Sequence, residues 1–254
     1  MKRPMPKVLA IFTAFLFLLS TGLCAAGGQS WYCMRQKNHA RPQAEPQMRF
    51  IENYDCAFLG RDPEEKVIYL TFDAGYENGN VARVLDTLQK HHAPGAFFVL
   101  DNLIRRNHDL ICRMADEGHL ICNHTMRHRD MSTMTEEQFR SELEGLEQVL
   151  REETGLEMAR FYRPPEGRFS EENLKWAENM GYTTVFWSLA YADWDNNKQP
   201  DPEKAFALLD ANIHNGAVVL LHPTSATNAD ILDRLLTKWE ADGYRFGSLI
   251  ELCK

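Results

Sequence analysis

From Lys66 onward, short apolar runs alternate along the chain with amphipathic stretches of helical period. Runs typical of buried strands occupy residues 67–72, 96–100, 183–187 and 217–221. Helices are expected after the first two runs, where apolar residues recur at helical spacing: Val81, Val84, Leu85 and Leu88, then Leu110, Ile111 and Met114. The same period predicts helices near 170–180, 202–213 and 231–239. This alternation indicates an α/β fold with a parallel sheet, which at this length is expected to close into a barrel.

The longest predicted helix begins near Thr135. Thr135 and Gln138 have the spacing of a capping box, in which each side chain bonds the backbone N–H of the other residue. Four apolar residues then form the expected buried stripe: Phe139, Leu143, Leu146 and Leu150.

The first 60 residues depart from this pattern and divide into two segments. Residues 1–26 contain basic residues, then an apolar run at 8–19 and small residues around Cys24. That is the layout of a secretory signal peptide, with an uncleaved anchor as the alternative; the run is too short to span a membrane. Residues 27–60 are polar and predict an extended N-terminal arm, and residues 61–254 are expected to form one folded domain.

Composition favours one globular domain, and its acidic charge argues against polyanionic partners. With 254 residues, 44% of them hydrophobic, the chain can bury one full-sized core. Its formal charge is −8, and loss of the basic first segment makes the remainder more acidic, which argues against nucleic acid and anionic membranes as partners. Five cysteines follow the signal segment, so at least one thiol is free, while a bridge between Cys33 and Cys56 stays open.

Polar residues lie just past several predicted strands: Asp73, His124, Arg163, Asp193 and His222. In a parallel barrel the carboxyl ends of the strands meet at one rim and carry the catalytic groups, so we expect these side chains to converge. His128 follows His124 by four residues, which lets both imidazoles reach one metal ion, although an exposed pair without metal fits that spacing equally well. No G-x-S-x-G, P-loop or G-x-G-x-x-G pattern is present, which excludes those chemistries.

The motifs around these residues resemble those of the NodB-like polysaccharide deacetylases, carbohydrate esterase family four. The likeness runs from about Trp31 to the C-terminus and keeps the family's motif order. Five motifs carry it: residues 71–75 (TFDAG), 123–128 (NHTMRH), 163–167 (RPPEG), 193–194 (DW) and 220–222 (LLH). The resemblance implies a distorted parallel (β/α) barrel of the NodB deacetylase type in a single domain.

Further runs are similar to one branch of that family, the peptidoglycan N-acetylmuramic acid deacetylases that form the muramic δ-lactam of spore cortex. These runs are residues 31–32 (WY), 75–78 (GYEN), 169–171 (FSE), 186–190 (FWSLA) and 228–230 (NAD). The resemblance implies a metal-assisted N-deacetylase of exported peptidoglycan, acting in the cell wall or the spore cortex on glycan without stem peptides.

The resemblance also implies roles for individual residues. Asp73 is the expected general base, oriented by Arg163, and His222 is the expected acid toward the departing amine, supported by Asp193. His124 and His128 are the expected ligands of a divalent ion, zinc or else cobalt or manganese.

Four more residues are assigned to substrate binding by the same resemblance. Trp194 is expected to pack against the acetyl group, and the backbone N–H of Glu166 is expected to bind the oxyanion. Tyr76 and Arg168 complete this set.

Two residues depart from the family pattern and keep alternatives open. Ala74 replaces the family's third metal ligand, which implies weaker metal affinity or a catalytically silent, wall-binding protein. Glu166 stands where the muramic branch usually has arginine, and it would repel the lactyl carboxylate unless Arg168 or Arg127 compensates. Another acetylated glycan therefore remains an alternative substrate: chitin oligomers, wall N-acetylglucosamine or acetylxylan.

Overall fold

The computed structural model describes residues 28–253, so the predicted signal peptide lies outside the described residues. Its main sheet contains eight strands, and all the pairings within it are parallel. The strands are β2 (Cys56–Ala57), β3 (Val67–Ala74), β4 (Gly95–Val99), β5 (Leu120–Asn123), β6 (Ala159–Tyr162), β8 (Thr183–Val185), β9 (Ala217–Leu221) and β10 (Arg245–Phe246). β3 lies centrally and pairs with β4, β9 and β10.

The sheet curls until its two sides meet between β8 and β9. The contact there is one isolated parallel bridge between Leu189 and Val219. Leu220 N–H donates to Leu189 O at 2.9 Å, and Ser188 N–H donates to Val218 O at 2.9 Å. The predicted parallel barrel in one domain is confirmed, with closure by a few bonds rather than by a full ladder.

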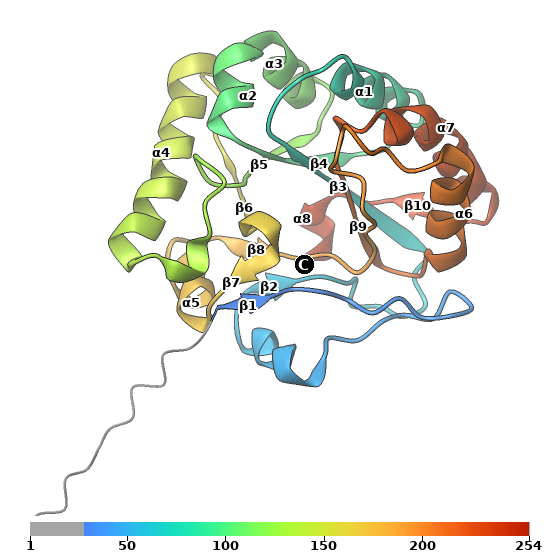
Figure 1. The fold of residues 1–254 in the computed structure, drawn as a ribbon, viewed down its shortest axis with the longest axis horizontal. Coiled ribbons are helices and arrows are strands. Elements are labelled where there is room, and N and C mark those ends of the chain that lie inside the picture. Colours follow the sequence, from blue (N-terminus) through green and yellow to red (C-terminus); the bar gives the residue numbers. More distant parts are fainter. Residues whose placement is uncertain (1–27, 254) are drawn as a thin grey trace, which may run out of the picture.

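Helices cover the outside of the sheet (Figure 1). They are α1 (Asn80–Lys90), α2 (Asp101–Arg106), α3 (His108–Asp116), α4 (Glu136–Thr154), α5 (Glu171–Asn179), α6 (Pro202–Asn212) and α7 (Ala226–Ala241). The short α8 (Leu249–Leu252) instead packs on the inward face of the strands, where Leu249 and Leu252 share a cluster with Val67 and Tyr69. Among residues 28–253, no helix has the length and apolar character needed to cross a bilayer.

The predicted capping box at the start of α4 is confirmed. Thr135 Oγ1 accepts from Gln138 N, and Gln138 Oε1 accepts from Thr135 N at 3.0 Å. The predicted stripe packs toward the sheet, and all four of its side chains are fully buried. Gly155 ends the helix in the left-handed conformation, with φ 74°, that glycine adopts at little cost.

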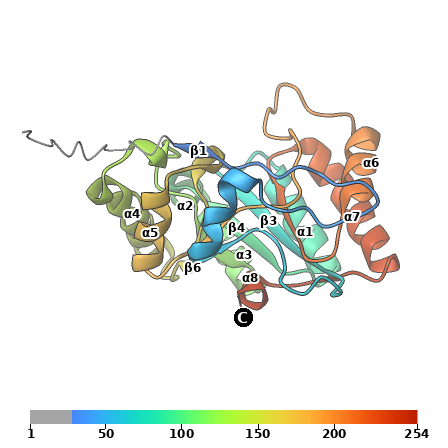
Figure 2. The ribbon, with the colours of Figure 1, turned by 90° about the horizontal axis from the view of Figure 1, so that it is seen from below.

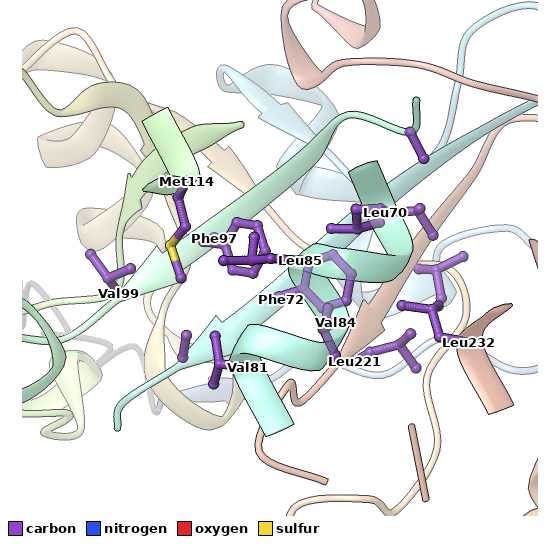
Figure 3. Close-up of a cluster of buried hydrophobic side chains, with 14 of the residues drawn as sticks. Leu70, Phe72, Val81, Val84, Leu85, Phe97, Val99, Met114, Leu221 and Leu232 are labelled. Atoms are coloured by element: carbon purple, nitrogen blue, oxygen red, sulfur yellow. The ribbon is translucent and has the colours of Figure 1, made fainter. Parts of the chain in front are cut away.

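The largest core cluster lies between the sheet and the outer helices (Figure 3). Phe72 of β3 stacks on Phe97 of β4 with ring centres 4.8 Å apart. Val84 and Leu85 of α1 pack on this pair, and Leu232 of α7 belongs to the same cluster. Strand residues alternate between the two faces, so the residues on either side of Phe72, including Asp73, point to the barrel interior.

The N-terminal arm packs on the side of the barrel away from α1–α3 (Figures 1 and 2). Within the described residues it contains β1 (Gln29–Ser30), the 3-10 helix η1 (Pro46–Asn53) and β2. β1 pairs antiparallel with β7 (Arg168–Phe169), and the buried Trp31 stacks on Phe186 with ring centres 4.6 Å apart. All five cysteines of residues 28–253 are free thiols, Cys33 and Cys56 included.

Candidate active site

Side chains from separate strands meet at the carboxyl-terminal edge of the barrel. Asp73 is near the end of β3, while His124, Arg163 and His222 directly follow β5, β6 and β9. Asp193 lies in the loop after β8. Parallel strands end at one edge of the sheet, which brings these residues together from distant parts of the chain.

A cavity of about 840 Å³ opens at this edge. Seven residues expected from the sequence line it: Asp73, Tyr76, His124, His128, Glu166, Trp194 and His222. Arg163 and Asp193 do not line the cavity, because they are buried and bond to Asp73 and His222 from behind. Arg168 is exposed and does not line it either.

Asp73 is held by a fully buried arginine. Arg163 Nη1 donates to Asp73 Oδ1 at 2.8 Å, and its Nη2 donates to Thr71 Oγ1 at 2.8 Å. Its Nε donates to Val185 O at 3.0 Å, and its guanidinium carbon lies 4.1 Å from the ring centre of Phe98. Because the planar guanidinium is fixed on three sides, the Asp73 carboxylate has one preferred orientation.

The charges around Asp73 keep its carboxyl ionised. Burial raises the pKa of Asp73, but the charge and hydrogen bond of Arg163 and the charge of His222 oppose burial, and the pKa lies below its ordinary value. Its Oδ2 lies 3.5 Å from His124 Nε2. An ionised, oriented carboxylate facing a cavity can act as a general base.

His124 and His128 lie edge to face across a tight loop rather than along a helix. Their ring centres lie 5.0 Å apart. Thr125 and His128 have positive φ angles of 71° and 53°, which turn the chain back on itself, and Thr125 Oγ1 accepts from His128 N at 3.0 Å. Non-glycine residues in this conformation are strained by about 1–3 kcal/mol and concentrate at functional sites.

The ring of His124 presents a nitrogen suited to a divalent ion. His124 Nδ1 donates to Arg163 O at 2.9 Å, which leaves the Nε2 lone pair for a metal. Burial is the largest cause that lowers the pKa of His124, to about 4, so this ring is neutral at physiological pH, as a ligand must be. Among residues 28–253, no group of three His, Cys, Asp or Glu side chains is arranged to hold a metal. An ion held here would have His124 and His128 as its imidazole ligands, with its other positions open to water or substrate.

His222 is oriented by the buried carboxylate of Asp193. Asp193 Oδ1 accepts from His222 Nδ1 at 2.8 Å, and Oδ2 accepts from His222 N at 2.8 Å. Burial lowers the pKa of His222, but the bond and the charge of Asp193, together with the charge of Asp73, outweigh burial and raise it. The cavity is thus lined by a carboxyl group whose pKa is lowered and a histidine whose pKa is raised, the opposite shifts expected of a base and an acid.

A left-handed turn at Glu166 and Gly167 forms another edge of the cavity. Their φ angles are 55° and 67°, and a Cβ at Gly167 would lie 2.8 Å from the Trp187 ring. The Glu166 carboxylate pairs with Arg168 Nε at 3.2 Å, and Arg168 also pairs with Asp130 at 3.2 Å. The positive charge of Arg168 is therefore shared between two carboxylates at the rim. No lysine or arginine of the described residues lines the cavity.

Two exposed aromatic rings flank the mouth of the cavity. Trp194 is 63% exposed, and its ring centre lies 6.3 Å from that of His222. Tyr76 is 43% exposed, and its hydroxyl accepts a hydrogen bond from Asn196. Exposed rings beside a polar centre are suited to pack against the apolar face of a sugar.

Comparison with known proteins identifies the family. The family model described as polysaccharide deacetylase matches residues 60–185. The chain is 42% identical over 224 residues to the peptidoglycan-N-acetylmuramic acid deacetylase PdaA of Bacillus subtilis, covering 88% of this chain and 85% of that protein. The chain belongs to the polysaccharide deacetylase family. The solved structure of B. subtilis PdaA, a family 4 carbohydrate esterase, matches this deacetylase with a TM-score of 0.85 at 41% identity, covering 89% and 97% of the two chains.

Other relatives show how far function varies within the family. A peptidoglycan-N-acetylglucosamine deacetylase of Bacillus cereus is 31% identical over 205 residues, covering 79% of this deacetylase and 72% of that protein. A Bacillus anthracis family 4 pseudoenzyme matches with a TM-score of 0.70 at 28% identity, covering 76% and 67% of the two chains. Deacetylases of the family depend in general on a metal.

Three residues of the deacetylase support the site but were given no role of their own by the sequence, although Thr71 and Asn228 lie in the motif 71–75 and the run 228–230. Thr71 binds Arg163, and its position two residues before Asp73 on the same strand face was an available signal. Asn228 donates to Asp193 at 2.6 Å, and Tyr191 donates to Asn228. Neither contact follows any sequence spacing, because the loop after β8 places Tyr191 and Asp193 while α7 places Asn228.

Proposed function

We propose that this deacetylase removes the acetyl group from N-acetylmuramic acid residues of exported peptidoglycan, toward muramic δ-lactam. The observation that carries the proposal is one cavity lined by the base Asp73, the acid His222 and the His124–His128 pair. The 42% identity to the B. subtilis muramic acid deacetylase, over most of both chains, supports the choice of sugar. The predicted signal peptide supports action in the cell wall or spore cortex.

The proposed reaction uses one proton transfer at each end of the scissile bond. Asp73 takes a proton from water as the water oxygen bonds to the acetyl carbonyl carbon, and Arg163 keeps the carboxylate in position. His222 then donates a proton to the departing nitrogen as the C–N bond breaks, which yields acetate and a free amine. A positioned acid or base of this kind contributes about 10²- to 10⁴-fold in rate.

His124 and His128 would hold the divalent ion, for which we propose zinc, with cobalt or manganese as the alternatives. When bound, such an ion supplies Lewis acidity that polarises the acetyl carbonyl and makes water easier to deprotonate. The neutral ring of His124 is ready to bind without losing a proton.

Substrate recognition is proposed to use the rim of the cavity. Trp194 packs against the acetyl group, and Tyr76 packs against the sugar. The backbone N–H of Glu166 contributes to binding the oxyanion, where a single donor contributes about 3–4 kcal/mol. The Glu166 carboxylate also favours the alternative, a neutral N-acetylglucosamine substrate, because a lactyl carboxylate near it is repelled unless Arg168 moves to pair with it.

The experiment is acetate release from peptidoglycan treated with an amidase, which exposes muramic residues without stem peptides. Acetate and muramic δ-lactam, the latter seen by mass spectrometry, should appear with the wild type and not with Asp73→Asn or a chelator. Acetate from N-acetylglucosamine oligomers alone would favour the second substrate. No acetate from any acetylated glycan, with zinc, cobalt or manganese added, would reject catalysis and favour a silent member of the family.

A further inference from the structure

Asn228 lies behind the proposed proton donor and bonds both parts of it. The Asn228 side chain is 1% exposed. Its Nδ2 donates to Asp193 Oδ2 at 2.6 Å and to the backbone oxygen of His222 at 3.0 Å. One amide group therefore ties the carboxylate that orients the histidine to the backbone that carries it.

The orientation of this amide is fixed from two further directions. Asp193 Oδ2 and His222 O can only accept, so the amide nitrogen faces them and Oδ1 accepts from the hydroxyl of Tyr191. The backbone N–H of Asn228 donates to Ser225 Oγ at 3.1 Å, since Ser225 caps the start of α7. The amide thus cannot rotate without breaking bonds at both ends.

The Asp193 carboxylate needs these donors because it is buried. It is 1% exposed and accepts from His222 Nδ1, His222 N and Asn228 Nδ2. A buried carboxylate is stable only when its oxygens are bonded, and each missing donor leaves it free to turn toward another partner. Without Asn228, Oδ2 keeps one donor, which comes from the same residue that Asp193 must orient.

We propose that Asn228 is a positioning residue for the acid: it locks Asp193, so that His222 keeps Nδ1 on the carboxylate and directs Nε2 to the substrate nitrogen. Tyr191 acts through Asn228, although it also lines the cavity. This inference rests on the proposed role of His222 as proton donor.

The first test compares Asn228→Leu with a matched control, Asn173→Leu. Asn173 is also a buried asparagine three residues after a capping serine, Ser170, but it lies at the start of α5 and contacts no proposed catalytic residue. Asn228→Leu should lower kcat for acetate release about 10- to 100-fold and change KM less than about threefold, as expected for a lost bond to a charged group. Asn173→Leu should lower thermal stability and leave kcat within about twofold of wild type.

The second test is a double-mutant cycle with Tyr191→Phe, a mild change that keeps the ring. Introduced into the wild type, Tyr191→Phe should lower kcat about 3- to 10-fold. Introduced into Asn228→Leu, it should lower kcat less than about twofold, because the effects of coupled residues are not additive. Multiplicative effects, or an Asn228→Leu rate within about twofold of wild type, would overturn the proposal. So would an Asn173→Leu loss of kcat equal to that of Asn228→Leu.

A third measurement does not need turnover. The Nδ1 proton of His222, bonded to Asp193, should give a downfield proton NMR signal that exchanges slowly in the wild type and in Asn173→Leu. The signal should broaden in Asn228→Leu and in Tyr191→Phe. If the wild type releases no acetate, the proposed function fails, while an unchanged signal in Asn228→Leu rejects the positioning role separately.

Discussion

Replacing Asp193 by asparagine should move the alkaline limit of activity to lower pH. Asp193 supplies the largest influences that raise the pKa of His222, a hydrogen bond and a negative charge, against burial, which lowers it. Asparagine keeps the shape but removes the charge, and its one oxygen cannot serve the three donors that point at the Asp193 carboxylate. Burial then dominates, so the pKa of His222 falls and the acid form is lost at lower pH.

The magnitude follows from the bond that is lost. A hydrogen bond to a charged group contributes about 1.5–3 kcal/mol, and about 1.4 kcal/mol corresponds to one pKa unit. The alkaline limb of the rate profile should therefore move down by about one to two pH units. Above the new limb, the rate should fall about 10- to 100-fold relative to wild type.

The assay is acetate release measured from about pH 5 to about pH 10, a range that contains the alkaline limb set by a histidine acid. The matched control is Asp195→Asn, because Asp195 is an exposed carboxylate two residues away whose Oδ1 accepts only from the backbone N–H of Asn197. That variant should keep the wild-type profile. An unmoved alkaline limb in Asp193→Asn, or an equal displacement in the control, would refute the role of Asp193.

Three further predictions concern single side chains. Asp73→Asn removes the base but keeps its shape, so acetate release should fall about 10²- to 10⁴-fold at unchanged circular dichroism; a smaller loss would exclude it as the base. Arg163→Met leaves a buried carboxylate unpaired and should lower the free energy of unfolding in urea by about 3–5 kcal/mol, whereas the exposed Arg168→Met should lower it by under about 1 kcal/mol; equal urea midpoints would contradict this. His128→Ala should lose the zinc that the wild type retains after dialysis, measured by elemental analysis, while the surface variant His108→Ala should retain it; zinc kept in His128→Ala would remove that residue from the metal site.

Strands and helices with one strongly patterned face could be predicted from the sequence. The run at 67–72 lies in β3, the run at 217–221 is β9, and the capping box fixed the start of α4. Elements too short to show a period were missed, such as α2 with six residues and β10 with two. The run at 183–187 was predicted longer than β8, which ends at Val185. Beyond that point the carbonyl oxygens of Val185 and Phe186 bind the Arg163 side chain.

The residues of the candidate site that lie at the ends of strands could be predicted from the sequence. Asp73 and His222 line one cavity because parallel strands end at a common edge. The directions of side chains in the loops could not be predicted in this way. Arg168 pairs with Asp130, a residue that no sequence pattern links to it, and Arg127 pairs with Glu142 of α4. Such choices depend on the positions of neighbouring loops, which only the folded chain defines.

The barrel closes through a short contact between residues 188–189 and β9, and the proposed acid lies just beyond this contact. Only a few bonds connect Ser188 and Leu189 to β9, whereas β3 pairs with β9 over five residues. Asp193 continues from one side of this contact and His222 from the other. Warming should open this contact before the five-residue ladder of β3 and β9, which strains the Asp193–His222 pair while Asp73 stays with Arg163. The rate of acetate release should therefore decrease at temperatures where circular dichroism still reports a folded protein. A crosslink between residues 188–189 and β9 should extend activity to higher temperature.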